Sequence, residues 1–174
     1  MRIATRNAIN EDKEIVWRLY EQSMKSHIEE IWGWDPVWQD TDFNKSYSNL
    51  ATFIIETDSV FAGYFQLESF SEHVYLRMLI IEPELRSKKI GAKVLAEILE
   101  IAHKSGKKVL LRVFKVNVNA KRFYIREGWV EIDEDDSSYL MEHPRCSVNR
   151  HEFVQSSDQS GLSRVIQAHK FPSN

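Results

Sequence analysis

The sequence is nearly without cysteine, and this excludes two kinds of scaffold. Cys146 is the single cysteine among 174 residues. One cysteine forms no disulfide framework within the chain and supplies no cysteine metal site, so we expect no metal. The length and the 43% apolar content fit one domain with its own hydrophobic core.

The sequence also lacks a long apolar run and a large excess of charge. No stretch approaches the roughly 18 consecutive apolar residues of a membrane helix. Lys and Arg number 23 against 26 Asp and Glu, a net charge of −3, so nothing favours a nucleic-acid binder. We see no leader segment. We therefore expect a cytoplasmic protein that binds neither membrane nor nucleic acid.

What is present is organised around the stretch from His73 to Gly106. A nearly continuous apolar run, 74–81, predicts a buried strand. After a basic loop, apolar residues recur at helical spacing up to Gly106, where a helix commonly stops. These residues are Ile90, Val94, Leu95, Ile98, Ile101 and Ala102. A second apolar run, 109–116, predicts another buried strand, so the order indicates a right-handed strand–helix–strand unit with parallel strands.

The start of that helix is unusually basic. Four cationic residues stand there, Arg86, Lys88, Lys89 and Lys93, around Ser87 as the expected N-cap. Positive charge opposes the helix dipole, which favours anions at a helix N-terminus. A bound anion would resolve the conflict, because free N–H groups and basic side chains would converge on it. A solvated basic turn explains the same residues, and the loop alone does not decide.

A second motif follows the second strand. Residues 117–129 match the pattern N-x-x-A-x-x-x-Y-x-x-x-G-[F/W/Y] at Asn117, Ala120, Tyr124, Gly128 and Trp129. Residues 86–91 match [Q/R]-x-x-G-x-[G/A] at all but one position. The two motifs lie at a suitable separation, with a helix and a strand between them. Together they resemble the GNAT superfamily, the acetyl-CoA-dependent N-acetyltransferases, over residues 1–143.

The resemblance implies the fold class. It is a mixed α/β (α+β) fold with a mixed central sheet, one parallel junction splayed around the cofactor, and flanking helices. Lys89 departs from the pattern, because it stands where the family has its first loop glycine. If that position needs a positive φ or a close backbone approach, a Cβ is unfavourable there. We expect the departure to affect cofactor affinity more than the fold.

The resemblance also implies direct acetyl transfer from acetyl-CoA, as co-substrate, to an amine. The residues implied to bind the cofactor are Leu79, Ile80, Ile81, Arg86, Ser87, Lys88, Lys89, Ile90, Gly91, Ala92, Asn117 and Tyr124. The backbone N–H of Leu79 is the implied oxyanion donor, and Tyr124 is the implied general acid for the leaving thiolate. Cys146 lies outside both motifs, so we expect no acetyl-cysteine intermediate.

The residue that takes the proton from the amine stays open. Some members of the family carry a glutamate on the strand before the loop, where this chain has Tyr75 and Arg77. Glu68 and His73 are the substitutes, and imidazole is suited to neutral pH. Each also reads as an ordinary surface residue, and a chain of waters is the third alternative.

The remaining elements follow from local signals. The helices we expect are about 11–31, capped by Asn10 and bent or broken near Ser26; 35–47, begun by Asp35-Pro36; and 119–127, closed by Gly128. The strands are 1–5, 51–57, 60–70, 129–132 and 138–141. Asp58-Ser59 joins the second and third strands as a hairpin.

Two clusters bear on the acceptor. Trp32, Trp34 and Trp38 stand at a helix–helix junction that borders the acceptor groove in the resembling family. Core packing explains them as well as an apolar or cationic acceptor does. The acidic turn, 131–136, is either a solvated turn or a rim that steers a cationic amine.

The C-terminal part, 144–174, lies beyond the resemblance. Its large apolar residues are Phe153, Val154, Leu162, Val165, Ile166 and Phe171, with a short helix expected after Ser160-Gly161. It is either loosely held or packs on the domain or on a partner subunit, in a monomer or a homodimer. Three functions compete for the whole chain: an N-acetyltransferase acting on a small-molecule or peptide amine, a non-catalytic acyl-CoA-binding or sensing domain, and a structural interaction domain.

Overall fold

The computed structural model describes residues 1–144, 162 and 165–166. The elements run in the order β1 (Ile3–Asn7), η1 (Asn10–Asp12), α1 (Lys13–Trp32), α2 (Pro36–Asn49), β2 (Ala51–Thr57), β3 (Val60–Ser69), β4 (His73–Ile81), η2 (Pro83–Leu85), α3 (Ile90–Lys104), β5 (Lys108–Phe114), α4 (Val118–Arg126), β6 (Val130–Glu134) and β7 (Ser138–His143). The predicted element order and the mixed α/β class are confirmed. None of the described helices is long and apolar enough to cross a membrane.

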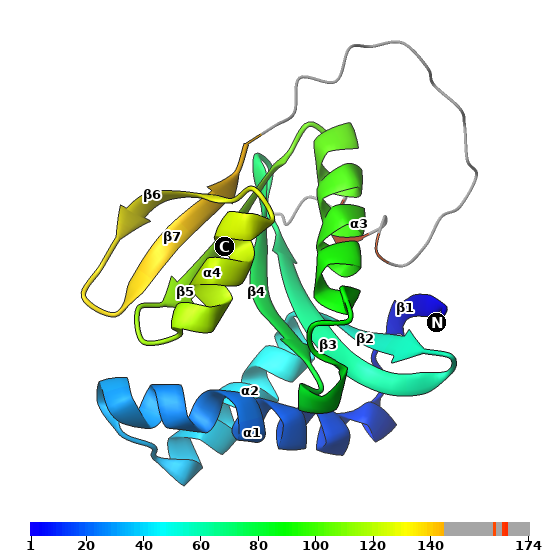
Figure 1. The fold of residues 1–174 in the computed structure, drawn as a ribbon. Helices are drawn as coiled ribbons and strands as arrows, with labels where there is room; N and C mark the ends of the chain where they lie inside the picture. The colour runs from blue at the N-terminus through cyan, green and yellow to red at the C-terminus, as the bar shows by residue number, and fades with distance from the viewer. Residues whose placement is uncertain (145–161, 163–164, 167–174) are drawn as a thin grey trace.

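The described strands form one mixed sheet. Its order is β1-β2-β3-β4-β5-β7-β6, and β4 and β5 are its parallel pair. The other neighbours pair antiparallel. The predicted parallel strand–helix–strand unit is therefore β4–α3–β5, at the centre of the sheet (Figure 1).

Helices cover both faces of the sheet. On one face, α3 and α4 pack through Val94, Ile98 and Tyr124 onto strand residues such as Leu76 and Leu111. On the other face, α1 and α2 pack through Val16, Leu19 and Phe43 onto Ile54, Tyr64 and Ile80. Side chains alternate between the faces along a strand, which is why the strands buried on both sides read as continuous apolar runs in the sequence.

The two parallel strands separate halfway along their length. Their pairing runs from His73 opposite Lys108 to Leu76 opposite Leu111, although each strand continues beyond that pair. Figure 1 shows β4 and β5 diverging toward the end of the sheet that α1 and α2 cross. We call the space between 77–81 and 112–114 the opening.

A β-bulge marks the point of separation. Gln66 of β3 lies opposite Met78, but Leu67 lies opposite Leu76, so Arg77 is the extra residue of β4. The bulge changes which face the following side chains reach: Leu76 packs on the α3 side, and Met78 packs on the α1 side. A bulge of this kind re-aims side chains and ends regular pairing.

Gly63 lets β3 approach the end of β4. Its φ is 154°, and a Cβ there would lie 2.2 Å from the carbonyl oxygen of Ile80. Such a distance is impossible for a real side chain, so glycine is required at this position. The contact fixes the part of β4 that borders the opening.

Three local predictions are wrong. Ser87 is not the N-cap of α3, because Ser87 and Lys89 both have positive φ and the helix begins only at Ile90. Asn10 does not cap the first helix; the carboxylate of Asp12 accepts the N–H of Ile9 instead, at 2.9 Å. No break occurs near Ser26, because α1 continues to Trp32 and Ile28 stays in the core.

Two other helix-end predictions are confirmed. Pro36 opens α2, and the Asp35 carboxylate accepts the N–H groups of Val37 and Trp38, both at 3.0 Å. Gly106 follows the end of α3 with a φ of 74°. A residue just past a helix end often needs this left-handed conformation, which glycine adopts without strain.

In the C-terminal part, Leu162, Val165 and Ile166 are helical and pack on the domain. Leu162 and Ile166 are buried in the core on the α3 side, and Val165 packs beside them. The Ser69 hydroxyl donates to the carbonyl of Ile166 at 3.0 Å and accepts from Lys107 at 2.8 Å. Cys146, Phe153, Val154 and Phe171 lie outside the described residues.

Candidate active site

The loop before α3 presents a row of backbone N–H groups. Ser87 and Lys89 have φ values of 63° and 62°, and a helical turn follows. Residues that alternate in and out of the left-handed region turn successive N–H groups toward one concave side, which attracts anions. Within the part of the chain that the structure describes, nothing accepts a hydrogen bond from the N–H groups of 87–92. The row therefore has the backbone arrangement that favours an anion at a helix N-terminus.

The basic side chains of this loop fall into two kinds. Arg86 is tied to the protein: its Nε donates to the carbonyl of Ile81 at 3.0 Å, and its Nη2 donates to Ser23 of α1 at 3.1 Å. Lys88, Lys89 and Lys93 are exposed and form no ion pair among the described residues. Arg86 thus anchors the loop on β4 and α1, and the lysines supply unneutralised charge.

The free edge of β4 faces the opening. The N–H of Glu82 donates to Ala62 of β3, so Glu82 and every second residue before it direct their backbone groups to β3. Leu79 and Ile81 consequently direct theirs to the other side, where no described strand pairs with them. Ile80 directs its backbone to β3, and its side chain lies in the core beneath α1, so the structure does not bring it to the opening.

Helix α4 packs against the first turn of α3. A Cβ on Gly91 would lie 3.3 Å from the ring of Phe123 and 3.8 Å from the Ile81 side chain. The glycine therefore lets α4 approach both the loop and the end of β4. This packing places the second sequence motif next to the first.

Tyr124 lies in the core between these elements. Its ring packs edge-on against Phe123 and Trp129, with centroids 5.2 and 5.7 Å apart, and 8% of the residue is exposed. Burial raises the pKa of Tyr124 well above its usual value. The hydroxyl therefore keeps its proton at neutral pH, as a proton donor must.

Asn117 has a structural task. Its side-chain oxygen accepts the N–H of Ala120 at 3.1 Å and caps α4. The motif position implied to contact the cofactor thus also starts the helix that carries Tyr124.

The three tryptophans lie in different environments. Trp32 is 64% exposed, and its ring meets Phe114, the last residue of β5, edge-on at 5.4 Å. Trp34 is half-buried, 6.3 Å from the Tyr20 ring and 5.5 Å from the ammonium of Lys25. Trp38 is 58% exposed. Trp32 is therefore the ring that the structure brings beside the opening.

The two proposed bases lie at different distances from the opening. His73 starts β4, stacks on Phe70 at 4.6 Å, and is separated from Leu79 by roughly 20 Å at about 3.3 Å per residue. Glu68 lies opposite Tyr75, so it is three residues of β3 beyond Phe65, the partner of Leu79. That separation is roughly 10 Å. The structure brings Glu68 closer to the opening than His73.

Most of the acidic residues of 131–136, which lie in β6 and in the turn to β7, are paired. Glu131 pairs with Lys121 at 2.9 Å, Glu134 with Lys115 at 3.0 Å, and Asp135 with Arg112 at 2.7 Å. Asp135 also accepts the N–H groups of 137 and 138, and these bonds hold its pKa down at about 2. Most of this charge is therefore engaged within the domain.

Arg77 is the charged residue at the opening to which the sequence assigned no role. It follows the last β4–β5 pair and forms neither an ion pair nor a hydrogen bond among the described residues. The sequence placed it in the strand, but a bulge depends on the register of two strands and has no signal in one of them.

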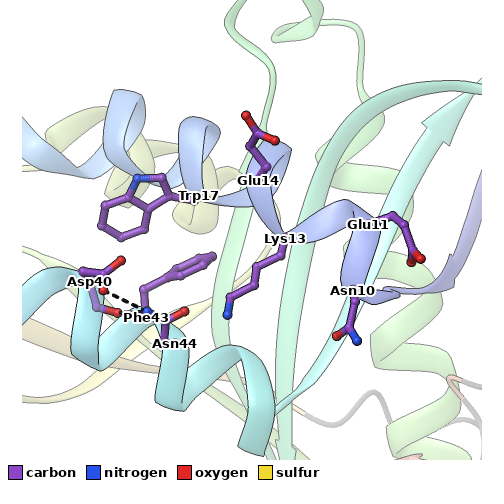
Figure 2. A pocket seen from close by; sticks show the side chains of 8 residues that line it. All are labelled: Asn10, Glu11, Lys13, Glu14, Trp17, Asp40, Phe43 and Asn44. Carbon is purple, nitrogen blue, oxygen red and sulfur yellow. Dashed lines mark hydrogen bonds between the residues drawn. The ribbon is translucent and has the colours of Figure 1, made fainter.

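A separate cavity of about 390 Å³ lies between the start of α1 and the middle of α2. Figure 2 shows Lys13 reaching from α1 toward α2 beside Trp17 and Phe43, whose rings are 4.9 Å apart. The residues that line the cavity are Asn10, Glu11, Lys13, Glu14, Trp17, Asp40, Phe43 and Asn44. Along α1, Trp17 is roughly 20 Å from Trp32, so this cavity is not the opening. Among the described residues, no cluster of three or more His, Cys, Asp or Glu side chains could hold a metal ion.

Comparison with known proteins identifies the fold of the opening. The sequence model of the acetyltransferase (GNAT) family matches residues 13–129, which include both motifs, β4 and α3. No curated protein is similar enough to this chain to count as a match.

Solved structures with the same fold are numerous. The PaiA N-acetyltransferase of Thermoplasma acidophilum, in complex with coenzyme A, is 25% identical with a TM-score of 0.67, over 82% of this chain and 98% of that one. An acetyltransferase of Thermus thermophilus is 17% identical with a TM-score of 0.65, over 82% and 96%. The ribosomal-protein-S18-alanine N-acetyltransferase of Escherichia coli is 12% identical with a TM-score of 0.62, over 88% and 100%. The last two likenesses show the fold alone.

Proposed function

The chain belongs to the GNAT family of acetyltransferases, and from that premise we propose that it transfers the acetyl group of acetyl-CoA directly to an amine. The acceptor is a small molecule or a peptide. The observation that carries the proposal is the row of N–H groups at 87–92, which have no acceptor among the residues that the structure describes. It lies beside Lys88, Lys89 and Lys93 and next to the opening between β4 and β5.

The pyrophosphate of acetyl-CoA fits the loop. Two phosphates need several donors and positive charge, and the N–H row with its lysines offers both. The likeness to a relative solved with coenzyme A supports this assignment. Lys89 contributes twice, because its left-handed backbone aims the N–H groups and its side chain adds charge.

The pantetheine arm and the thioester fit the edge of β4. The Leu79 N–H and C=O and the Ile81 N–H are the backbone groups left on this edge, since Arg86 already occupies the carbonyl of Ile81. Amides of the pantetheine arm would pair with them as an added strand does. The Leu79 N–H then lies where the thioester oxygen gains negative charge.

Tyr124 completes the transfer. The amine nitrogen attacks the carbonyl carbon, the carbon–sulfur bond breaks, and the thiolate takes the proton of the Tyr124 hydroxyl. A base removes the extra proton of the amine, and solvent reprotonates the tyrosine. Glu68, acting through water, is a better candidate for the base than His73, because it lies roughly half as far from Leu79.

The acceptor side is formed by α1 and the end of β5. Trp32 and Phe114 present an apolar wall at the opening. Trp34 packs on the same core cluster as Phe114, beside Tyr20, and Trp38 lies in the first turn of α2. We assign Trp32 to the acceptor, with Trp34 and Trp38 as flanking candidates.

A non-catalytic acyl-CoA-binding or sensing domain is the second candidate. Lys89 favours it, because a non-glycine residue carries strain at that left-handed position. So does β4, which carries no carboxylate between His73 and Ile81. Turnover separates the two functions, because both bind acetyl-CoA and only one consumes it.

The experiment is a thiol-release assay with acetyl-CoA over amines, amino acids, polyamines, aminoglycosides and peptides, together with calorimetric titration of acetyl-CoA. We expect binding that weakens with salt and thiol release that depends on an amine. Tyr124→Phe should lower kcat by roughly 100-fold or more and change the KM for acetyl-CoA much less, because the hydroxyl acts when thiolate charge develops. Binding without release supports the sensing domain; no binding at millimolar acetyl-CoA rejects both.

A further inference from the structure

The charged side chains of β4 and β5, the strands that border the opening, are cationic. Three cationic side chains leave β4 and β5: Arg77, Lys108 and Arg112. Arg112 pairs with Asp135 at 2.7 Å, and Lys108 pairs with Glu142 at 3.2 Å. Arg77 is exposed, and within residues 1–144 it has no acidic partner. The sheet therefore leaves one guanidinium uncompensated, and it is the one beside the thioester site.

The bulge directs Arg77 to the acceptor side of the sheet. Leu76 packs on the α3 side and Met78 on the α1 side, and the extra residue between them lies where the face changes. Burial raises the pKa of Tyr20 on α1 to about 12; the negative charge of Asp42 adds to that rise, and the positive charge of Arg77 opposes it. Burial also raises the pKa of Tyr75; Arg77 and Arg112 oppose that rise, and Glu68 and Asp135 add to it. The charge of Arg77 therefore acts on Tyr20, which packs on the face that α1 covers.

The distance to the reacting atoms is short. Arg77 is two residues from Leu79, roughly 7 Å along the strand. A small molecule whose amine reaches the thioester at Leu79 can place a second polar group at Arg77. A guanidinium presents a planar fork of donors that matches a carboxylate in two parallel hydrogen bonds.

The surroundings argue against a polycationic acceptor. The acidic turn, which would attract one, is paired with Lys121, Lys115 and Arg112. An ammonium held near Arg77 would be repelled by the guanidinium, and three of the five carboxylates of the turn are already paired with lysine or arginine. The unpaired Arg77 and the mostly paired acidic turn both favour a negatively charged group on the ligand.

We propose that Arg77 binds a carboxylate of the acceptor, so that the preferred acceptors are amines bearing a carboxylate close to the reacting nitrogen, such as amino acids. This inference rests on the proposed acetyltransferase function and names its substrate class. Arg77 acts as a specificity-determining residue, and Trp32 with Phe114 contacts the rest of the acceptor.

The test compares each amino acid with its own carboxamide in the thiol-release assay at saturating acetyl-CoA. Rates are expressed per concentration of uncharged amine, because the carboxamide lowers the pKa of the neighbouring amine. We expect kcat/KM to favour the free acid by about 10- to 100-fold, the range for a hydrogen-bonded charge pair. Arg77→Gln should bring the ratio close to one, and Arg77→Lys should keep part of it.

Controls separate this inference from the proposed function. Lys108→Gln removes another cation of the sheet, at the far end of β5, and should leave the ratio unchanged. Calorimetric titration should give the same acetyl-CoA affinity for wild type and Arg77→Gln. A ratio near one in wild type, a preserved ratio in Arg77→Gln, or turnover confined to amines without a carboxylate overturns the carboxylate assignment while leaving acetyl transfer intact. Failure to bind acetyl-CoA rejects the acetyltransferase itself.

Discussion

The basic loop, 86–92, and the acidic turn, 131–136, look alike in the sequence and differ in the structure. Each is a short cluster of like charge, and for each the sequence allowed a solvated turn or a ligand site. In the turn, three carboxylates are paired with lysine or arginine of the same domain. In the loop, the lysines are unpaired and the backbone N–H groups have no acceptor among the described residues.

The difference shows what makes a charged cluster available to a ligand. When the charges of a turn are paired within the fold, a ligand gains little by binding there, because it would have to replace those pairs. The loop holds Ser87 and Lys89 in the left-handed region, at a cost of roughly 1–3 kcal/mol each. It also leaves hydrogen-bond donors without acceptors. A bound anion would accept hydrogen bonds from these donors. When no anion is bound, the Arg86 contacts to Ile81 and Ser23 hold the loop in this conformation.

Reversing the charge of the loop should have the largest effect. The double substitution Lys88→Glu, Lys89→Glu should weaken acetyl-CoA binding by roughly 100-fold, about tenfold for each charge pair lost. Folding should be little affected, since acidic residues are favoured at a helix N-terminus. Titration calorimetry and thermal unfolding measure the two effects. The matched control is Asp136→Lys in the turn, which should leave acetyl-CoA affinity within about twofold. Equal affinities for wild type and the double variant would mean that the loop is a solvated turn.

Removing the Asp135 carboxylate from the turn should lower stability and leave acetyl-CoA binding unchanged. Asp135→Ala deletes the acceptor for the N–H groups of 137 and 138 and the partner of Arg112, so the melting temperature should fall by several degrees. Acetyl-CoA affinity should stay unchanged. A variant that keeps its melting temperature and loses cofactor affinity would reverse our assignment of the two clusters.

The same residue gives a dependence on pH. Its pKa in the folded protein is about 2, below the ordinary value of about 3.9 for an unfolded chain. Its contribution to stability is therefore present above about pH 4 and is lost as pH falls toward 2. The difference in melting temperature between wild type and Asp135→Asn should be constant from pH 7 to about 5 and shrink below about 4. A difference that grows on acidification would contradict the assignment.

Restoring glycine in the loop should have the smallest effect. Lys89→Gly relieves the left-handed backbone and should raise the free energy of unfolding by about 0.5–1 kcal/mol. It also removes one positive charge, so acetyl-CoA affinity should fall by roughly three- to tenfold. Denaturant unfolding and titration measure the two changes on one variant. A rise in affinity would show that the lysine only crowds the loop.

Most of the fold follows from patterns along the sequence, because the elements depend on local signals. The apolar run 74–81, the helical period after Ile90 and the Asp35-Pro36 start each have a physical cause within a few residues of themselves. The errors arose where an interaction from outside the segment prevailed. Asp12 stands at the N-cap position of α1 in place of Asn10, and its carboxylate accepts the N–H of Ile9 and binds Arg6, with bonds of 2.7 and 2.8 Å to Arg6.

The site was predictable only as far as its motifs extend. The loop and Tyr124 belong to patterns with fixed spacing, and the structure brings them together through Gly91 and Phe123. Glu68 and His73 looked equivalent because both precede the central strand, and only the strand register shows their different distances from Leu79. Arg77 had no signal, since its role depends on a bulge between two strands and on the pairing of its neighbours.

The contact between Ser69 and Ile166 has a consequence for the order in which the molecule is built. Its two residues are 97 positions apart. A chain emerging from the ribosome releases the whole sheet before Ile166, and N-terminal regions begin to fold during synthesis. Until Leu162 and Ile166 arrive, the apolar surface that they cover on the α3 side stays open to solvent. The nascent protein therefore passes through a stage in which its sheet is complete and its core is not. During that stage it exposes an apolar surface to which chaperones and other nascent chains can bind.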